Sequence, residues 1–212
     1  MLKNYHYDLY DIQNITDVER IFQREELTGL NVTIPYKEKI LPYLNELSDE
    51  AEKTGAVNCI LIKDGVKKGF NTDVYGFEKT LEVHRKKFHT SALIVGDGGA
   101  AKAVKYVLEK YQIPYKTVSR KSELNFENLS IQQVSENPLI IQCTPVGTFP
   151  NVNDCLAFPF EGISNQHLII DLIYNPSYTA FLKKASEKGA KTVNGLYMLE
   201  QQAEKNWEIW TV

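Results

Sequence analysis

A lysine and an aspartate, each preceded by an asparagine, are the residues of this sequence best suited to chemistry on a polar substrate. Lys37 follows the segment Asn31–Tyr36, and Asp73 follows Asn71-Thr72. A lysine ammonium can stabilise negative charge that builds on an oxygen and donate a proton to it, while an aspartate orients the lysine and substrate hydroxyl groups. Taken alone, Lys37 could be a surface charge, and Asp73 could cap the helix that follows it.

A glycine-rich turn in the middle of the chain predicts a nucleotide site. Gly96, Gly98 and Ala101 fit the G-x-G-x-x-A pattern, in which small residues let the backbone approach a pyrophosphate at the start of a helix. The turn follows a predicted buried strand over residues 91–95 and opens a predicted helix over residues 100–110, which is the context the motif requires. Asp97 is unexpected here, because a carboxylate opposes a pyrophosphate unless it points away. A purely structural glycine turn is the alternative to the predicted nucleotide site.

The residues after the next predicted strand, over residues 115–119, bear on the choice of cofactor. An acidic residue at this place would accept hydrogen bonds from a ribose 2′-hydroxyl. The sequence instead has Ser119-Arg120-Lys121. Arg120 and Lys121 can pair with a 2′-phosphate, which favours NADP over NAD. Both could equally be charges on a solvated surface.

Short apolar runs alternate with helical patterns, which favours an α/β fold of parallel βα units. Predicted strands cover residues 5–12, 30–34, 91–95, 115–119, 139–142 and 168–172, and a hairpin joins 56–63 to 66–70. Predicted helices cover residues 74–84, 100–110 and 179–188, and another begins at a capping box of Thr16 and Glu19 and ends near residue 23. The last helix carries one predicted apolar face, formed by Leu196, Leu199, Ala203, Trp207 and Trp210.

Composition narrows the classes of function. The chain has 212 residues, of which 43% are hydrophobic and 24% charged, as in ordinary globular proteins of one or two domains. A net charge of −3 gives no reason to expect nucleic acid as a partner. No apolar stretch of membrane-spanning or signal-peptide length is present. Cys59, Cys143 and Cys155 lack metal-ligand spacing, so we expect no metal and a reducing, cytoplasmic compartment.

Taken together and in this order, the motifs resemble those of the shikimate dehydrogenase family. The matching segments are Asn31–Glu38, Gly55–Asn58, Asn71–Asp73, Gly96–Ala101, Cys143–Gly147, Asp171–Pro176 and Met198–Ala203. The resemblance implies two α/β domains. Residues 1–83 and 195–212 would form a substrate-binding domain that lacks the family's first elements, and residues 84–194 would form an NADP-binding Rossmann domain. The final helix would return to the first domain.

The resemblance also implies a reaction, the NADPH-dependent and reversible reduction of 3-dehydroshikimate to shikimate in chorismate and aromatic amino acid biosynthesis. Lys37 and Asp73 match the catalytic pair. The residues that match substrate-binding positions are Asn31, Thr33, Asn58, Tyr174 and Gln202. The residues that match cofactor positions are Gly96, Gly98, Gly99, Ala100, Ala101, Ser119, Arg120, Lys121, Thr144, Gly147 and Gly195. Without the family pattern, the asparagines read as turn residues, Tyr174 as a core residue and Gln202 as an exposed helix residue.

The chain departs from the family pattern at its start. Family members begin with a strand and helix whose Ser-x-Ser motif binds the substrate carboxylate, and nothing before Tyr5 matches it. We therefore expect exposed apolar surface and unpaired backbone groups, with low stability or self-association, and weak substrate binding. A monomer or homodimer that binds small molecules is expected. Two alternatives stay open: a catalytically weakened nucleotide-binding paralogue and an NAD-using quinate/shikimate dehydrogenase.

Overall fold

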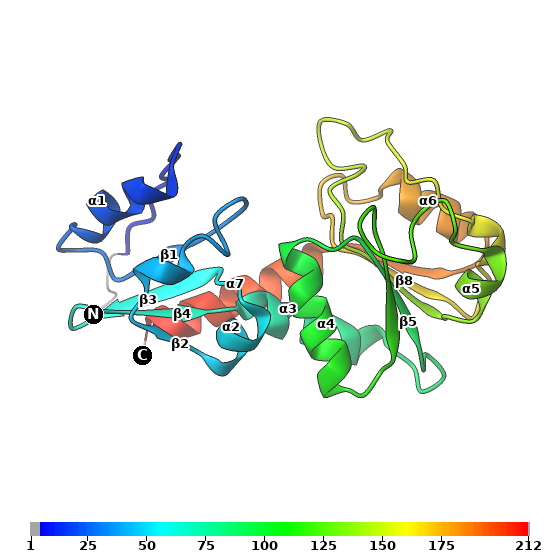
Figure 1. The fold of residues 1–212 in the computed structure, drawn as a ribbon, viewed down its shortest axis with the longest axis horizontal. Coiled ribbons are helices and arrows are strands. Elements are labelled where there is room, and N and C mark those ends of the chain that lie inside the picture. The colour runs from blue at the N-terminus through cyan, green and yellow to red at the C-terminus, as the bar shows by residue number, and fades with distance from the viewer. Residues whose placement is uncertain (1–4, 212) are drawn as a thin grey trace.

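The computed structural model describes residues 5–211, which form two β-sheets joined by two long helices (Figure 1). The first sheet has the strand order β1-β3-β4-β2, and the second has the order β6-β5-β7-β8-β9. The strands are β1 (Gly29–Asn31), β2 (Glu46–Leu47), β3 (Cys59–Lys63), β4 (Val66–Phe70), β5 (Ala92–Val95), β6 (Tyr115–Val118), β7 (Leu139–Gln142), β8 (Leu168–Asp171) and β9 (Lys191–Val193). The helices are α1 (Val18–Phe22), α2 (Asp49–Thr54), α3 (Thr72–His84), α4 (Gly99–Lys110), α5 (Ile131–Ser135), α6 (Ala180–Glu187) and α7 (Leu196–Trp210). Short 3-10 turns cover Ile15–Asp17, Leu41–Tyr43 and Phe160–Gly162.

The first sheet is built around the predicted hairpin, which is confirmed. Strands β3 and β4 pair antiparallel, and the turn between them consists of Asp64 and Gly65 with φ values of 52° and 78°. Two positive φ values are what a two-residue hairpin turn requires, and aspartate followed by glycine adopts them readily. Strand β1 pairs antiparallel with β3, and β2 pairs parallel with β4.

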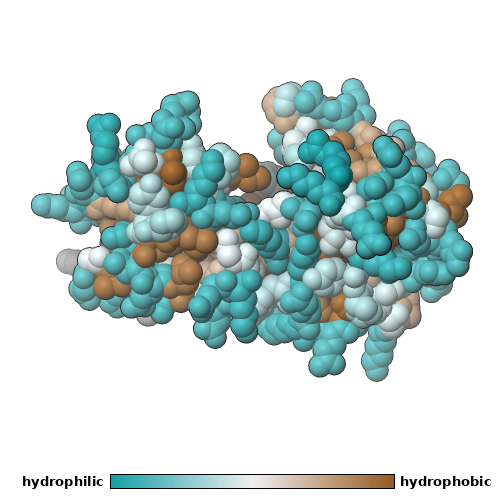
Figure 2. Space-filling view, viewed as in Figure 1, coloured by the Kyte–Doolittle hydropathy of each residue, from teal (hydrophilic) through white to brown (hydrophobic). Residues whose placement is uncertain are grey.

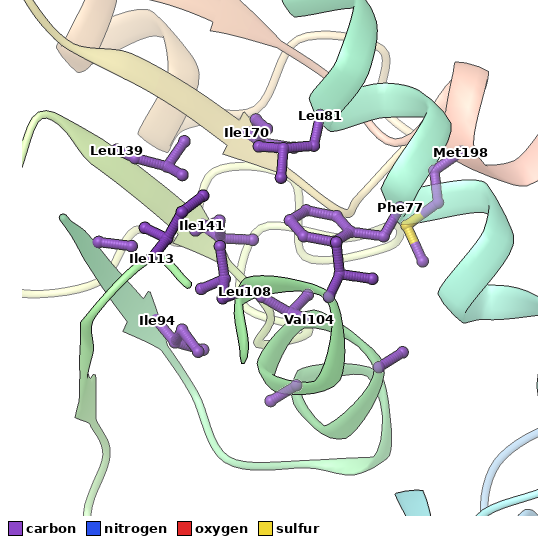
Figure 3. Close-up of a cluster of buried hydrophobic side chains, with 14 of the residues drawn as sticks. Phe77, Leu81, Ile94, Val104, Leu108, Ile113, Leu139, Ile141, Ile170 and Met198 are labelled. Atoms are coloured by element: carbon purple, nitrogen blue, oxygen red, sulfur yellow. The ribbon is translucent and has the colours of Figure 1, made fainter. Parts of the chain in front are cut away.

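The second sheet is parallel throughout and is covered by helices on both faces. Every residue of β5, β7 and β8 is buried, as expected for strands between two layers of helices. On one face, Ile94, Ile141 and Ile170 belong to the core that includes residues of α3 and α4 (Figure 3). On the other face, strand residues pack with Val134 of α5 and Phe181 of α6. The α/β class with a Rossmann-type doubly wound sheet is confirmed.

Helices α3 and α7 connect the two sheets and pack along each other (Figure 1). They approach closely at Gly76, where a Cβ atom would lie 2.5 Å from the carbonyl oxygen of Met198. The end of α7 lies against the first sheet, where the Trp210 Nε1 donates a hydrogen bond of 2.9 Å to the carbonyl oxygen of Ile60. The final helix therefore returns to the first sheet, as expected.

Two predictions near the start of the chain are wrong. Residues 5–12 form no strand, because no other strand of residues 5–211 pairs with them. The first helix does not begin at a Thr16–Glu19 capping box. Instead, the Asp17 carboxylate accepts a hydrogen bond of 3.2 Å from the backbone N–H of Asn14, and a 3-10 turn leads into α1. The Asp17 backbone N–H in turn donates a hydrogen bond of 3.1 Å to the Asn14 carbonyl oxygen, so backbone groups close this turn.

The apolar face predicted for the last helix is buried only in part, because Leu199 and Trp210 are half-buried and its other three residues are exposed. Leu196 and Trp207 are each 45% exposed, and Ala203 is exposed as well. The buried residues of α7 are Met198 and Asn206. The face of α7 that enters the interior therefore carries a polar side chain.

An open apolar groove of about 730 Å³ lies between residues 5–12 and β1, and Trp207 and Trp210 also line it. The exposed fractions of Tyr7, Leu9 and Ile34 are 64%, 90% and 79%. The expected exposed apolar surface is thus present, and Figure 2 shows hydrophobic residues at the surface of the half that contains the first sheet. No helix in the part of the chain that the structure describes is long and apolar enough to cross a membrane.

Candidate active site

The lysine and the aspartate singled out from the sequence form a partly buried ion pair. Lys37 lies in the segment after β1, and Asp73 lies in the first turn of α3. The Lys37 Nζ donates to the Asp73 Oδ2 at 2.6 Å, and the two side chains are 20% and 11% exposed. The Lys37 carbonyl oxygen accepts a hydrogen bond of 2.8 Å from the Val57 N–H, which ties this segment to the residues that precede β3. The ammonium group is therefore held in a defined direction.

Asn58 connects this pair to α3 and α7. Its Nδ2 donates to the Asp73 Oδ1 at 2.9 Å and to the Gln202 Oε1 at 3.3 Å. Its Oδ1 accepts from the backbone N–H of Thr72 at 2.8 Å. The side chain is 4% exposed, and its polar atoms are engaged as a buried amide requires. Both oxygens of Asp73 thus accept hydrogen bonds, one from Lys37 and one from Asn58.

Asn31 joins the same network through a residue that the sequence did not single out, Asn206. The Asn31 Oδ1 accepts a hydrogen bond of 2.7 Å from the Asn206 Nδ2, and the Asn31 Nδ2 donates to the Tyr7 Oη at 2.9 Å. The Asn206 Nδ2 also donates to the Gln202 Oε1 at 3.2 Å, and the Asn206 Oδ1 accepts from the Thr72 Oγ1 at 2.6 Å. Asn206 follows Gln202 by one helical turn, a spacing that would have pointed to it.

Two of the predicted substrate-binding residues lie outside this network. Thr33 is exposed in the segment between β1 and Lys37, and Tyr174 is 51% exposed in the loop after β8. Among the described residues, neither side chain makes a hydrogen bond to another side chain. The structure therefore brings together Lys37, Asp73, Asn58, Asn31 and Gln202, but leaves Thr33 and Tyr174 apart from them.

The glycine-rich turn lies between β5 and α4, as the motif requires. A Cβ atom at Gly98 or Gly99 would meet nothing within 4 Å, so the backbone here faces open space. The free N–H groups at the start of α4 can bind an anion in that space. The Asp97 carboxylate forms an ion pair with Lys105, two turns into α4. The negative charge that was unexpected in this turn is therefore offset by a lysine of the same helix.

The other predicted cofactor residues follow β6 and β7, the two neighbours of β5 in the parallel sheet. Ser119–Lys121 follow β6, and Thr144 and Gly147 follow β7. The carboxyl ends of these strands meet at one edge, where open parallel sheets bind their ligands. Among the described residues, Arg120 and Lys121 form no ion pair. Their positive charges are available to a phosphate, so this edge fits a dinucleotide with a 2′-phosphate.

Two further residues fix the backbone of the loop that follows β8. Gly195 precedes α7 and approaches the Leu172 carbonyl oxygen so closely that a Cβ atom would lie 2.1 Å from it. Asp171, at the end of β8, is fully buried, and this burial raises its pKa to about 6. Its carboxylate accepts hydrogen bonds from the Thr179 Oγ1 at 2.6 Å and the Ile173 N–H at 3.0 Å, which hold the loop that carries Tyr174.

The comparisons with known proteins point to one family. Residues 2–60 match the family model described as the shikimate dehydrogenase substrate binding domain. The shikimate dehydrogenase (NADP(+)) of Methanococcus vannielii is 36% identical, over 98% of this chain and 81% of the relative. A crystal structure of a shikimate dehydrogenase in complex with NADP+ has a TM-score of 0.84 at 31% identity, over 95% of this chain and 78% of that one. The structure of the quinate dehydrogenase from Corynebacterium glutamicum in complex with NAD has a TM-score of 0.83 at 26% identity. This match covers 94% of this chain and 78% of that one. The chain belongs to the shikimate dehydrogenase family.

Proposed function

We propose that this protein is an NADP-dependent shikimate dehydrogenase, which reversibly reduces 3-dehydroshikimate to shikimate. The observation that carries the proposal is the Lys37–Asp73 ion pair, held by Asn58 at the junction of β3, α3 and α7. An ammonium group that is aimed by a carboxylate is the group this reaction needs, because reduction of a ketone builds negative charge on its oxygen. Family membership supports the choice of substrate.

In the proposed reaction, Lys37 holds a proton at its Nζ for the oxygen of the substrate and stabilises the charge on that oxygen. Asp73 orients Lys37, and Asn58 orients Asp73 through the hydrogen bond to its Oδ1. Asn31, Thr33, Tyr174 and Gln202 would bind the remaining polar groups of the substrate. NADPH, when bound, supplies the hydride. In the reverse direction, Lys37 accepts the proton of the substrate hydroxyl.

The edge formed by β5, β6 and β7 would hold the cofactor. The turn from Gly96 to Ala101 would bind the pyrophosphate at the start of α4, and Ser119, Arg120 and Lys121 would bind the 2′-phosphate. Thr144, Gly147 and Gly195 would lie near the nicotinamide. The positive charges after β6 support NADP over NAD. An NAD-using quinate/shikimate dehydrogenase remains the second candidate, because a quinate dehydrogenase in complex with NAD has a similar fold.

The proposal includes the organisation of the chain. Residues 1–83 and 195–212 would form the substrate-binding domain and residues 84–194 the cofactor domain, and the two separate sheets support this division. The protein would act as a monomer or homodimer. The three free cysteines support a reducing, cytoplasmic compartment.

The experiment is an assay of NADP⁺ reduction with shikimate, followed by the absorbance of NADPH. Lys37→Met is compared with the wild type and with Lys39→Met, a matched change at an exposed lysine two residues away. We expect Lys37→Met to lower kcat by about 10²–10⁴-fold and Lys39→Met to leave it unchanged. The assay is repeated with quinate and with NAD⁺ to test the second candidate.

Two results would contradict the proposal. A Lys37→Met variant with wild-type kcat would exclude Lys37 as the proton donor. A folded wild-type protein that binds NADPH but does not turn over shikimate at any concentration would indicate the nucleotide-binding paralogue instead.

A further inference from the structure

We propose that Asn206 is a positioning residue that sets which end of the Asn31 amide faces the substrate. The inference rests on the proposed function, because it assigns a role within that substrate site. Asn206 is 1% exposed and lies behind Asn31 on α7, so it does not itself reach the substrate. Asn206 determines that Asn31 presents its N–H donor to the substrate. The substrate atom that meets this donor must therefore be an acceptor oxygen.

The direction of a side-chain amide has to be inferred from its partners, because its oxygen and nitrogen have nearly the same shape. Two backbone groups provide unambiguous starting points here. The Thr72 N–H can only donate, and it meets the Asn58 Oδ1 at 2.8 Å. The Leu199 carbonyl can only accept, and it meets the Gln202 Nε2 at 3.0 Å. These contacts determine the direction of the Asn58 and Gln202 amides.

The same directions follow from the next contacts in the network. With its Oδ1 engaged, Asn58 turns its Nδ2 to the Asp73 carboxylate, which accepts at 2.9 Å. With its Nε2 engaged, Gln202 turns its Oε1 inward, where it accepts from the Asn58 Nδ2 at 3.3 Å. Every donor therefore meets an acceptor, and reversing either amide would place donor against donor or acceptor against acceptor.

Asn206 transmits this direction to Asn31. The inward Gln202 Oε1 requires a donor, so the Asn206 Nδ2 faces it at 3.2 Å, and the Asn206 Oδ1 is left to accept from the Thr72 hydroxyl at 2.6 Å. The second hydrogen of the Asn206 Nδ2 then points to Asn31 and meets its Oδ1 at 2.7 Å.

Only the Nδ2 of the Asn31 amide faces away from Asn206. Its Oδ1 is engaged from behind, so its Nδ2 faces the exposed side, where it donates to the Tyr7 Oη at 2.9 Å. A carbonyl or hydroxyl oxygen of a bound substrate would be met by this Nδ2. If Asn206 could not donate, the Asn31 amide would be free to reverse and present its oxygen instead.

The test is Asn206→Asp, which keeps the shape of the side chain but replaces the donor by an acceptor. The Asn31 amide must then turn its Nδ2 inward. We expect the KM for shikimate to rise by about tenfold or more, with kcat and the KM for NADP⁺ little changed, since roughly one hydrogen bond to the substrate is lost. Asn165→Asp, at an exposed asparagine, controls for the added charge.

A double-mutant cycle separates positioning from a general structural effect. In the Asn31→Ala background, Asn206→Asp should no longer change the KM for shikimate, because its effect passes through Asn31. An additive effect of the two substitutions on KM would overturn the proposal. If the Asn206→Asp variant does not fold, the cycle uses Asn206→Leu, which removes the donor without adding a charge.

A measurement without substrate keeps the proposal separate from the proposed function. In NMR spectra of isotope-labelled protein, the Asn31 side-chain N–H₂ should show nuclear Overhauser contacts to the Tyr7 ring in the wild type and lose them in Asn206→Asp. Contacts that persist in the variant would overturn the role of Asn206 even if shikimate is turned over. A wild type with the predicted contacts but no turnover would instead contradict the proposed function alone.

Discussion

Replacing the buried Asp171 by asparagine should change how the stability of this protein depends on pH. Asp171 is fully buried at the end of β8, and desolvation raises its pKa from 3.8 to about 6, although the Thr179 hydroxyl and the Ile173 N–H lower it. The folded protein therefore binds the proton more tightly than the unfolded chain does. For such a group, the free energy of unfolding falls as the pH rises from about 4 to about 6 and is constant above that range.

The magnitude follows from the two pKa values. A shift of roughly two units corresponds to about 3 kcal/mol of lost stability once the carboxyl is ionised in both states. Integrating between the two pKa values gives a loss of about 1.6 kcal/mol at pH 5 and about 3 kcal/mol at pH 8. Asp171→Asn removes this loss but also removes an acceptor from the Thr179 hydroxyl, which costs about 1 kcal/mol at every pH.

Urea unfolding of the wild type and of Asp171→Asn at several values between pH 5 and pH 8 measures the effect. The stability of the variant relative to the wild type should increase by about 1.4 kcal/mol from pH 5 to pH 8. Asp154→Asn, at an exposed aspartate, controls for the loss of one charge. A difference between variant and wild type that stays constant over this range would refute the reasoning that burial raises the pKa of Asp171.

Three other changes test particular contacts. Lys105→Met leaves Asp97 in the glycine-rich turn without its ion-pair partner. A half-exposed ion pair contributes up to about 1 kcal/mol, so the variant should bind NADPH about two- to fivefold more weakly in calorimetry. An unchanged affinity for NADPH would contradict this. Gly195→Ala should lower the free energy of unfolding by about 1–3 kcal/mol, since its Cβ would lie 2.1 Å from a backbone oxygen, and a variant as stable as the wild type would disprove the close approach. Leu9→Glu, at a side chain 90% exposed in the groove, should reduce the fluorescence of a bound apolar dye without lowering stability.

The sequence was most informative where a structural element depends on its own residues. Asp64-Gly65 specifies a hairpin turn because both residues tolerate positive φ. The apolar strand before Gly96 and the helix formers after it place a turn at the edge of a parallel sheet. The short elements β2, α2, α5 and β9 were not predicted, because two to six residues carry too little periodicity to be recognised.

Elements that depend on a distant partner were predicted less well. Residues 5–12 have the composition of a strand, but a strand exists only where another backbone pairs with it, and no strand of the described chain does so. In α7, hydrophobic residues such as Trp207 were expected inside and Asn206 was not. The reverse is found, because the helix faces α3 with the side that carries Asn206 and leaves Trp207 at the groove.

The sequence alone thus determined the α/β class and the glycine-rich turn, since each is carried by residue types at short spacing, whereas Lys37 and Asp73 lie 36 residues apart and were paired by the family resemblance. Only the tertiary structure decided how the polar groups of the site face one another. Lys37 and Asp73 meet because β1, β3 and α3 converge, and the direction of the Asn31 amide follows from partners on α3 and α7 that lie far away in the chain. A hydrogen bond has a donor and an acceptor, and which end of an amide takes which role is settled by its neighbours in space.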